Sequence, residues 1–302
     1  MVAPHVASLI ELPRTPPPLV EARAACARLA RTHYENFAVV SRLVPRRLRT
    51  HVRALYATCR TVDDLGDEAP NDREALLDRF EQELDAAYRG TPRHPVLVAL
   101  RETIEALDLP ETPFRRLIEA NRIDQRQRRY ETFEDLLHYC EHSADPVGRL
   151  YLALFGFRDE ARGRLSDRIC TALQLTNFWQ DVRRDLAAGR IYIPGEDLAR
   201  FGVSEADLAA PRAGPGVRAL LRFEVARTRD VFREGLPLLA SVRGRLRIAL
   251  ALFVRGGEAV LRKIEAQGYD TLRRRPSLRS TEKARLTIGA LLAPARPPWT
   301  DD

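Results

Sequence analysis

Residues 56–67 of the chain read YATCRTVDDLGD and place four polar side chains at helical spacing. On a helix of 3.6 residues per turn, Tyr56, Arg60, Asp63 and Asp67 share one face. Residues 174–185 read QLTNFWQDVRRD and give a second polar stripe, made of Gln174, Asn177, Asp181 and Asp185. Each stretch therefore predicts a helix that carries two carboxylates one turn apart.

The two acidic pairs predict a metal site. Carboxylates one turn apart repel each other, and two facing pairs are costly unless cations lie between them. Hard oxygen ligands select Mg²⁺, which binds one or two carboxylates and takes further oxygens from water and phosphate. One such pair is typical of a solvated helix face, but a second copy among apolar residues favours metal binding. We therefore expect Mg²⁺ and a phosphate or diphosphate at Asp63, Asp67, Asp181 and Asp185.

Helical periodicity extends over most of the chain. Apolar residues recur at three- and four-residue spacing in segments 22–33, 48–65, 73–88, 96–107, 114–128, 165–186, 217–240 and 246–267, without a comparable alternating strand pattern. We expect one all-α domain over residues 21–290, between proline-rich irregular tails at 1–20 and 291–302. The glycine- and proline-rich stretch 189–215 predicts a long connection, either a surface loop or a lid.

The number and distribution of charged residues indicate which kind of partner the protein binds. The 302 residues are 45% hydrophobic and 30% charged, which is typical of a globular protein, and the net charge is +7. Of the 49 basic residues, 47 are Arg, and most of these stand within a few residues of Asp or Glu. This dispersed surplus favours an anionic substrate or an anionic membrane surface. We expect no nucleic-acid partner, and a non-enzymatic basic helical protein that binds nucleic acid is the distant alternative.

The sequence lacks the motifs that are typical of several classes of enzyme. The sequence has no Gly-rich nucleotide motif, no G-x-S-x-G elbow and no H-E-x-x-H pair. The four cysteines form no C-x-x-C pair and no secretory signal is apparent, so we expect free thiols and a cytoplasmic location. Acidic helices in an all-α body predict diphosphate ionisation, in which metal ions and arginines withdraw the diphosphate and leave an allylic cation in an apolar cavity.

At these residues the sequence resembles the squalene/phytoene synthase family of head-to-head prenyl synthases. The resemblance covers most of the chain, in ordered motifs at residues 36–37, 43–49, 56–68, 139 with 145–148, 174–182, 189–194 and 268–270. It implies an isoprenoid-synthase helical fold around a central substrate cavity. It also implies that both acidic pairs hold Mg²⁺.

The resemblance assigns roles to single residues. It implies that Tyr56 and Arg60 lie near the diphosphate and that Tyr192 lies near the reacting carbons, as the catalytic set. The residues that it implies for substrate binding are Tyr139, Val147, Gly148, Gln174, Asn177, Arg190 and Arg274. For Tyr139, Val147 and Gly148, simple packing is the alternative role. His33 is a further candidate, either a substrate contact or a surface residue.

Within the family, residues 36–37 and 177–181 resemble the bacterial hydroxysqualene synthases of the hopanoid pathway. Those enzymes are implied to ionise presqualene diphosphate and to quench the rearranged cation with water, without a hydride donor. Gln180 stands where an Arg is common in phytoene and presqualene diphosphate synthases, and Glu35 and Gly257 also depart from the carotenoid pattern. The alternative is a presqualene diphosphate or squalene synthase that condenses two molecules of farnesyl diphosphate.

The chemistry of the ligands also predicts where the protein works. An amphiphilic substrate and an oily product favour peripheral contact with the inner face of the membrane. We also expect contact with downstream enzymes of the pathway.

Overall fold

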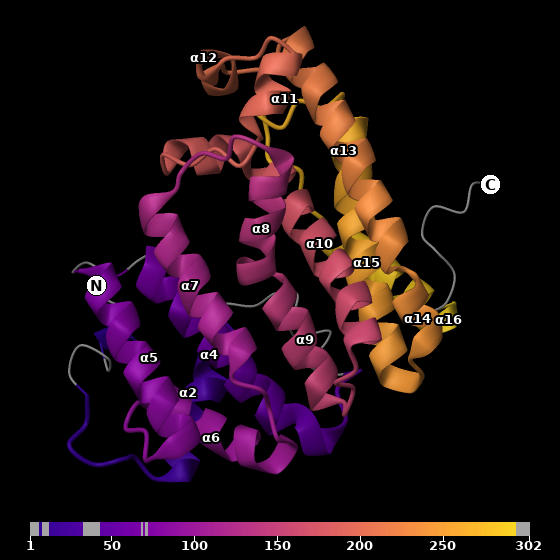
Figure 1. Ribbon diagram of the computed structural model, residues 1–302. Coiled ribbons are helices and arrows are strands. Elements are labelled where there is room, and N and C mark those ends of the chain that lie inside the picture. The colour runs from indigo at the N-terminus through magenta and orange to yellow at the C-terminus, as the bar shows by residue number, and fades with distance from the viewer. Residues whose placement is uncertain (1–5, 8–11, 33–42, 68, 70–71, 294–302) are drawn as a thin grey trace. The chain divides into compact units, whose positions relative to one another are not determined.

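Helices make up all the regular structure of the computed structural model, which describes residues 6–7, 12–32, 43–67, 69 and 72–293 (Figure 1). Over these residues no strand occurs, which confirms the predicted all-α class. In chain order the elements are α2 (Leu19–Thr32), η1 (Arg46–Leu48), α4 (Arg49–Asp67), α5 (Arg73–Arg89), α6 (Pro95–Leu107), α7 (Thr112–Arg126), α8 (Phe133–Ser143), α9 (Asp145–Leu154), α10 (Glu160–Ala187), α11 (Gly195–Arg200), α12 (Glu205–Ala209), α13 (Pro215–Gly235), α14 (Pro237–Ser241), α15 (Gly244–Ala266) and α16 (Ser280–Leu292).

The expected helix over residues 217–240 is two helices. Helix α13 ends at Gly235, and α14 starts at Pro237 as its first helical residue. Proline has no backbone N–H and is well placed only at the start of a helix, so the apolar periodicity continues through a break in the helix. Helix α2 begins at Leu19, and the last helix of the described residues, α16, ends at Leu292.

The chain forms two compact units. Unit 1 consists of residues 1–126 and 146–159. In it α4 packs against α2, α5, α6 and α7. Its core contains Leu65, Phe80, Leu97 and Ile118, all with no exposed surface. This core fixes α4, which carries the first polar stripe.

Unit 2 consists of residues 127–145 and 160–302. Its central helix is α10, which packs against α8, α12, α13, α14 and α15. Trp179 and Phe232 lie at its core with no exposed surface. Gly257 of α15 allows close packing there, because a β-carbon at this position would lie 2.6 Å from Phe232 Cζ.

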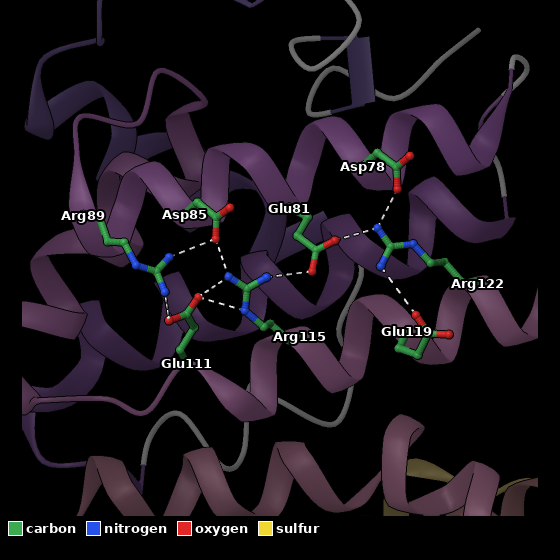
Figure 2. A network of polar contacts seen from close by, with 8 residues as sticks. All are labelled: Asp78, Glu81, Asp85, Arg89, Glu111, Arg115, Glu119 and Arg122. Atoms are coloured by element: carbon green, nitrogen blue, oxygen red, sulfur yellow. Dashed lines mark hydrogen bonds and ion pairs between the residues drawn. The ribbon is translucent and has the colours of Figure 1, made fainter.

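Helices α5 and α7 of unit 1 are joined by a network of ion pairs on their outer surface (Figure 2). Arg122 Nη2 donates to Asp78 and to Glu81, at 2.6 Å each. Arg115 donates to Glu81 at 2.8 Å and also contacts Asp85 and Glu111. Because both arginines of α7 contact two carboxylates of α5, the network stabilises the packing of α7 on α5.

We expect the substitution Arg115→Ala to lower the melting temperature by about 2–4 °C, since a network of partly exposed pairs contributes about 1 kcal/mol. The loss should shrink in about 1 M NaCl, where the screening length falls to about 3 Å. Thermal denaturation followed by circular dichroism at two salt concentrations measures both effects. The control is Arg164→Ala, because Arg164 is 69% exposed and lies 3.8 Å from Glu160. Equal losses in the two variants would contradict the role of the network.

The structure also bears on membrane spanning. Among the described helices, none has both the length and the apolar character that crossing a bilayer requires.

Candidate active site

Helix α4 carries the first polar stripe on one face, as predicted. Tyr56 and Arg60 are partly buried, and Asp63 and Asp67 reach solvent. The opposite face of the helix buries apolar residues such as Leu55, Val62 and Leu65 in the core of unit 1. The 3.6-residue period thus separates a core face from a polar face that is available for a ligand.

The two carboxyl groups at the end of α4 perturb each other. Desolvation raises the pKa of Asp63 to about 7; the charge of Asp67 adds to the rise, and Arg60 opposes it. The Asp63 side chain is surrounded by protein atoms, yet it keeps contact with water. A cation that binds both carboxylates would relieve this unfavourable charge.

Arg60 has a partner inside its own helix. Its guanidinium forms an ion pair with Asp64, one turn further on, whose side chain is 1% exposed. Asp64 was not among the predicted site residues, although its spacing of four positions from Arg60 was a readable signal. The pair holds Arg60 in place on the polar face. Desolvation also raises the pKa of Tyr56 to about 12, so this phenol stays protonated at neutral pH.

Helix α7 supports the acidic end of α4 through two amides. Gln125 Nε2 donates to the backbone oxygens of Gly66 and Asn121, both at 3.0 Å. Asn121 Nδ2 donates to Leu117 O at 3.1 Å, and Asn121 also hydrogen-bonds to the Asp63 side chain. A β-carbon at Gly66 would overlap Asn121 Oδ1 and would lie 2.9 Å from its Cγ. Gly66 therefore lets α7 approach the carboxylates of α4 closely. The sequence analysis did not predict the two amides, Asn121 and Gln125.

We expect Gly66→Ala to reduce catalytic turnover at least about tenfold, because the new methyl group displaces Asn121 from Asp63 and shifts a group at the reaction centre. Steady-state product formation measures this effect. The matched control is Gly256→Ala in α15, where no atom lies within 4 Å of a new β-carbon. That variant should keep its activity and gain about 0.5–1 kcal/mol of stability. Full activity of Gly66→Ala would show that Asn121 does not position the site.

Helix α10 carries the second stripe within unit 2. Gln174, Asp181 and Asp185 are partly buried and Asn177 is exposed, while Leu175, Trp179 and Val182 on the other side are buried. Trp179 Nε1 donates to Thr228 Oγ1 of α13 at 2.7 Å. This bond and the packing around Trp179 fix the rotation of α10 and therefore the direction of its acidic residues.

Asp181 is held by an arginine from the segment that comes after α15. Arg275 Nε and Nη2 donate to the two carboxylate oxygens of Asp181, at 2.5 and 2.8 Å. The predicted basic residue Arg274 is its neighbour in the chain and is exposed. Sequence reasoning missed Arg275, because three successive arginines in a non-helical segment give no periodic signal for direction.

Four aromatic rings of unit 2 form a buried cluster, which we call the aromatic cluster: Tyr130, Tyr139, Phe178 and Tyr192. Tyr192 stacks on Phe178 with ring centroids 3.9 Å apart and planes 12° apart. Tyr139 and Tyr130 each lie 5.7 Å from Tyr192. The structure thus brings together two predicted residues, Tyr139 and Tyr192, and adds two that were not predicted.

The segment that carries Arg190 and Tyr192 is tied down. Ile191 N donates to Arg128 O at 2.9 Å, and Gly195 N donates to Tyr130 O at 2.8 Å. Arg129 Nη1 donates to Gly189 O at 2.7 Å, and Arg190 N donates to Asp185 O at 2.8 Å. The first part of this connection is thus a fixed segment, and residues 191–194 are buried in it, so neither a surface loop nor a mobile lid describes it. The position of Tyr192 is accordingly set by backbone as well as by stacking.

The remaining predicted residues have separate places. Val147 and Gly148 lie on α9 in unit 1, where Val147 is 40% exposed and Gly148 is partly buried. His33, like Glu35, Asn36 and Phe37 of the family motif, lies outside the described residues.

The donor chemistry fits a divalent cation of the Mg²⁺ type. Asp63 and Asp67 form one carboxylate pair on α4 in unit 1, and Asp181 and Asp185 form another on α10 in unit 2. Within the part of the chain that the structure describes, no three His, Cys, Asp or Glu side chains gather as a ligand cluster. Two carboxylates per pair match Mg²⁺, which uses one or two carboxylates and fills its shell with water and phosphate oxygens.

The chain is similar to known proteins over most of its length. The family model for squalene/phytoene synthase matches residues 30–282. The phytoene synthase of Thermus thermophilus is 36% identical over 275 residues, which cover 91% of this chain and 94% of that protein. The phytoene synthase of Mycobacterium tuberculosis is 34% identical over 271 residues, which cover 87% of this chain and 88% of that protein.

Solved structures give the same result. The crystal structure of squalene synthase HpnC from Alicyclobacillus acidocaldarius is 50% identical to the chain, with a TM-score of 0.80, and covers 88% of this chain and 98% of that one. The crystal structure of a dehydrosqualene synthase in complex with a ligand is 26% identical, with a TM-score of 0.83, and covers 91% and 96%.

Proposed function

Because the chain belongs to the squalene/phytoene synthase family of head-to-head prenyl synthases, we propose that it is a hydroxysqualene synthase. The reaction takes presqualene diphosphate and water to hydroxysqualene and diphosphate. The observation that carries the proposal is the 50% identity to the squalene synthase HpnC over 88% of the chain, against 36% to the phytoene synthase of Thermus thermophilus. The family identity supports a prenyl synthase over the nucleic-acid-binding alternative.

The environment of Gln180 supports a reaction with one diphosphate. Gln180 is 7% exposed, and its Nε2 donates to the backbone oxygen of Pro276. In condensing members an Arg is common at this position. Here a neutral amide is used in a backbone contact, so this position supplies no cation for a second diphosphate.

Ionisation breaks the bond between the substrate carbon and the diphosphate oxygen, and the electron pair leaves with the diphosphate. Bound Mg²⁺ would supply charge stabilisation to the leaving group, held by Asp63 and Asp67 on α4 and by Asp181 and Asp185 on α10. Arg60 adds a fixed positive charge to the α4 face, because its own helix orients it. We assign diphosphate contact to Tyr56, Gln174, Asn177, Arg190 and Arg274.

The carbocation that remains needs an apolar, electron-rich wall. The aromatic cluster provides ring faces whose quadrupoles attract a cation, and Tyr192, 7% exposed, lies at its centre. Water then adds to the rearranged cation and loses a proton, so no hydride donor is required. Val147, Gly148 and His33 remain proposed substrate contacts.

The test is a product assay with purified protein, Mg²⁺ and no nicotinamide cofactor. Presqualene diphosphate should give hydroxysqualene and diphosphate, and a chelator should stop the reaction. Farnesyl diphosphate offered alone should give no product. Turnover of farnesyl diphosphate alone would instead favour the second candidate, a presqualene diphosphate or squalene synthase.

The substrate and product also suggest where the enzyme works. We propose a cytoplasmic enzyme in peripheral contact with the inner membrane face, where downstream enzymes take up the oily product. Flotation with anionic liposomes should carry the protein, and the absence of binding would remove the membrane contact.

A further inference from the structure

The segment between α15 and α16 is fastened to the acidic end of α10. We call residues 270–277 the strap. Leu272 O accepts a hydrogen bond from Arg183 Nη1 at 3.0 Å, and Pro276 O accepts one from Gln180 Nε2. Together with the Arg275–Asp181 pair, three contacts therefore bind the strap to residues 180–183 of α10.

The two ends of the strap have their own anchors. Asp270 accepts hydrogen bonds from Ala213 N at 2.9 Å and from Arg218 Nη2 at 3.1 Å. At the other end, Ser277 O accepts one from Lys263 Nζ at 2.6 Å. A change at Arg275 therefore removes one of three contacts in the middle of the strap, while the hydrogen bonds of Leu272 and Pro276 and both ends stay attached.

Arg275 acts as the counter-charge of the second acidic pair. Its two donors engage both oxygens of Asp181, and the charges of Asp181 and Asp185 both raise the pKa of Arg275. Arg184 is the other cation on Asp181, but its Nη1 lies 3.5 Å away and its side chain is 69% exposed. The guanidinium of Arg275 thus occupies the place where a cation would bind Asp181.

A metal ion and this guanidinium compete for the same carboxylates. Two cations close to the same carboxylate repel each other, and the double charge of Mg²⁺ strengthens the repulsion. The Arg275 side chain is 42% exposed and stands on a non-helical segment. It can therefore turn away into solvent at small cost, whereas Asp181 is fixed by α10.

We propose that Arg275 is a surrogate cation for the second acidic pair, and that Mg²⁺ binding at Asp181 and Asp185 displaces Arg275 and loosens the strap. The inference rests on the proposed function, since it takes these two residues as metal ligands. Arg275 is a positioning residue in this scheme: it keeps the pair neutralised before the metal arrives. The displaced guanidinium is then available to an anionic group.

The test measures Mg²⁺ affinity by calorimetry without substrate, in the double variant Asp63→Asn/Asp67→Asn, where only the second pair can bind. Adding Arg275→Ala should tighten Mg²⁺ binding about two- to fivefold, the value of an exposed ion pair that no longer has to be broken. Arg273→Ala removes the same charge two positions away, at an exposed side chain, and is the matched control. Equal shifts in the two variants, or weaker binding with Arg275→Ala, would overturn the proposal.

A second measurement monitors the strap itself. In the wild-type protein, Mg²⁺ should speed hydrogen exchange of the amides of residues 271–275, and in Arg275→Ala their exchange should already be faster without metal. No change in strap exchange with Mg²⁺ would also overturn the proposal. Asp181→Asn separates the two hypotheses: Mg²⁺ binding unaffected by Asp181→Asn contradicts the metal site of the proposed function. Binding that depends on Asp181 but not on Arg275 contradicts the surrogate cation alone.

Discussion

Replacing Asp63 or Asp181 by Ala is expected to lower the turnover of presqualene diphosphate by about a thousandfold. Each change removes one carboxylate from an acidic pair, and losing one preorganised electrostatic contact to a developing charge costs about a hundred- to a thousandfold in rate. Product formation under saturating Mg²⁺ measures the loss. The matched control is Asp230→Ala, an exposed aspartate that pairs with Arg233 on the same helix. It should leave turnover unchanged.

The substitution Asp63→Ala should lower turnover without lowering the stability of the metal-free protein at pH 7. The carboxyl has a pKa of about 7 in the folded protein and 3.8 as an ordinary aspartate. The folded state therefore binds more protons between these values, and without metal the free energy of unfolding falls as the pH rises from about 4 to 7. Asp63→Ala lacks this loss, so it should be at least as stable as the wild type at pH 7. An inactive variant that is also strongly destabilised would contradict the assignment.

Replacing Trp179 by Ala is expected to give the largest loss of stability. The side chain has no exposed surface, it packs between α10 and α13, and its indole N–H donates to Thr228. Removing a buried tryptophan costs about 3–5 kcal/mol, which corresponds to a fall in melting temperature of about 10 °C for a unit of this size. Differential scanning calorimetry measures the shift.

The control for this prediction is Trp179→Phe. It keeps most of the buried apolar surface but leaves the Thr228 hydroxyl without the indole donor, so it should cost about 1–3 kcal/mol. Comparable losses in the two variants would show that the hydrogen bond, and not the packing, holds α10 on α13.

Helical periodicity was sufficient to predict most of the helices and both polar stripes. The stripes on α4 and α10 lie on single faces because a 3.6-residue period decides which side chains meet the core. The same reasoning predicted a single helix across Pro237, because the apolar spacing continues there. The helix breaks at this point because proline has no backbone N–H. Asp64 was overlooked although its spacing from Arg60 pointed to a pair.

The residues that sequence reasoning could not find depend on contacts between elements. Asn121 and Gln125 reach the end of α4 from α7, and Gly66 leaves the room for them. Tyr130 joins the aromatic cluster from a non-helical segment. Such contacts depend on how distant segments pack, which spacing within one helix does not encode. Arg275, and not Arg274, contacts Asp181. The two residues stand in a non-helical segment, where side-chain directions do not repeat at a fixed spacing.

The ion pair between Arg275 and Asp181 has a consequence for the biosynthesis of the protein. Under the proposed metal site, a bare acidic pair on α10 would make the folding of unit 2 depend on the supply of metal. Because the chain carries its own counter-charge on the same unit, we expect unit 2 to fold without the ion and to bind it afterwards.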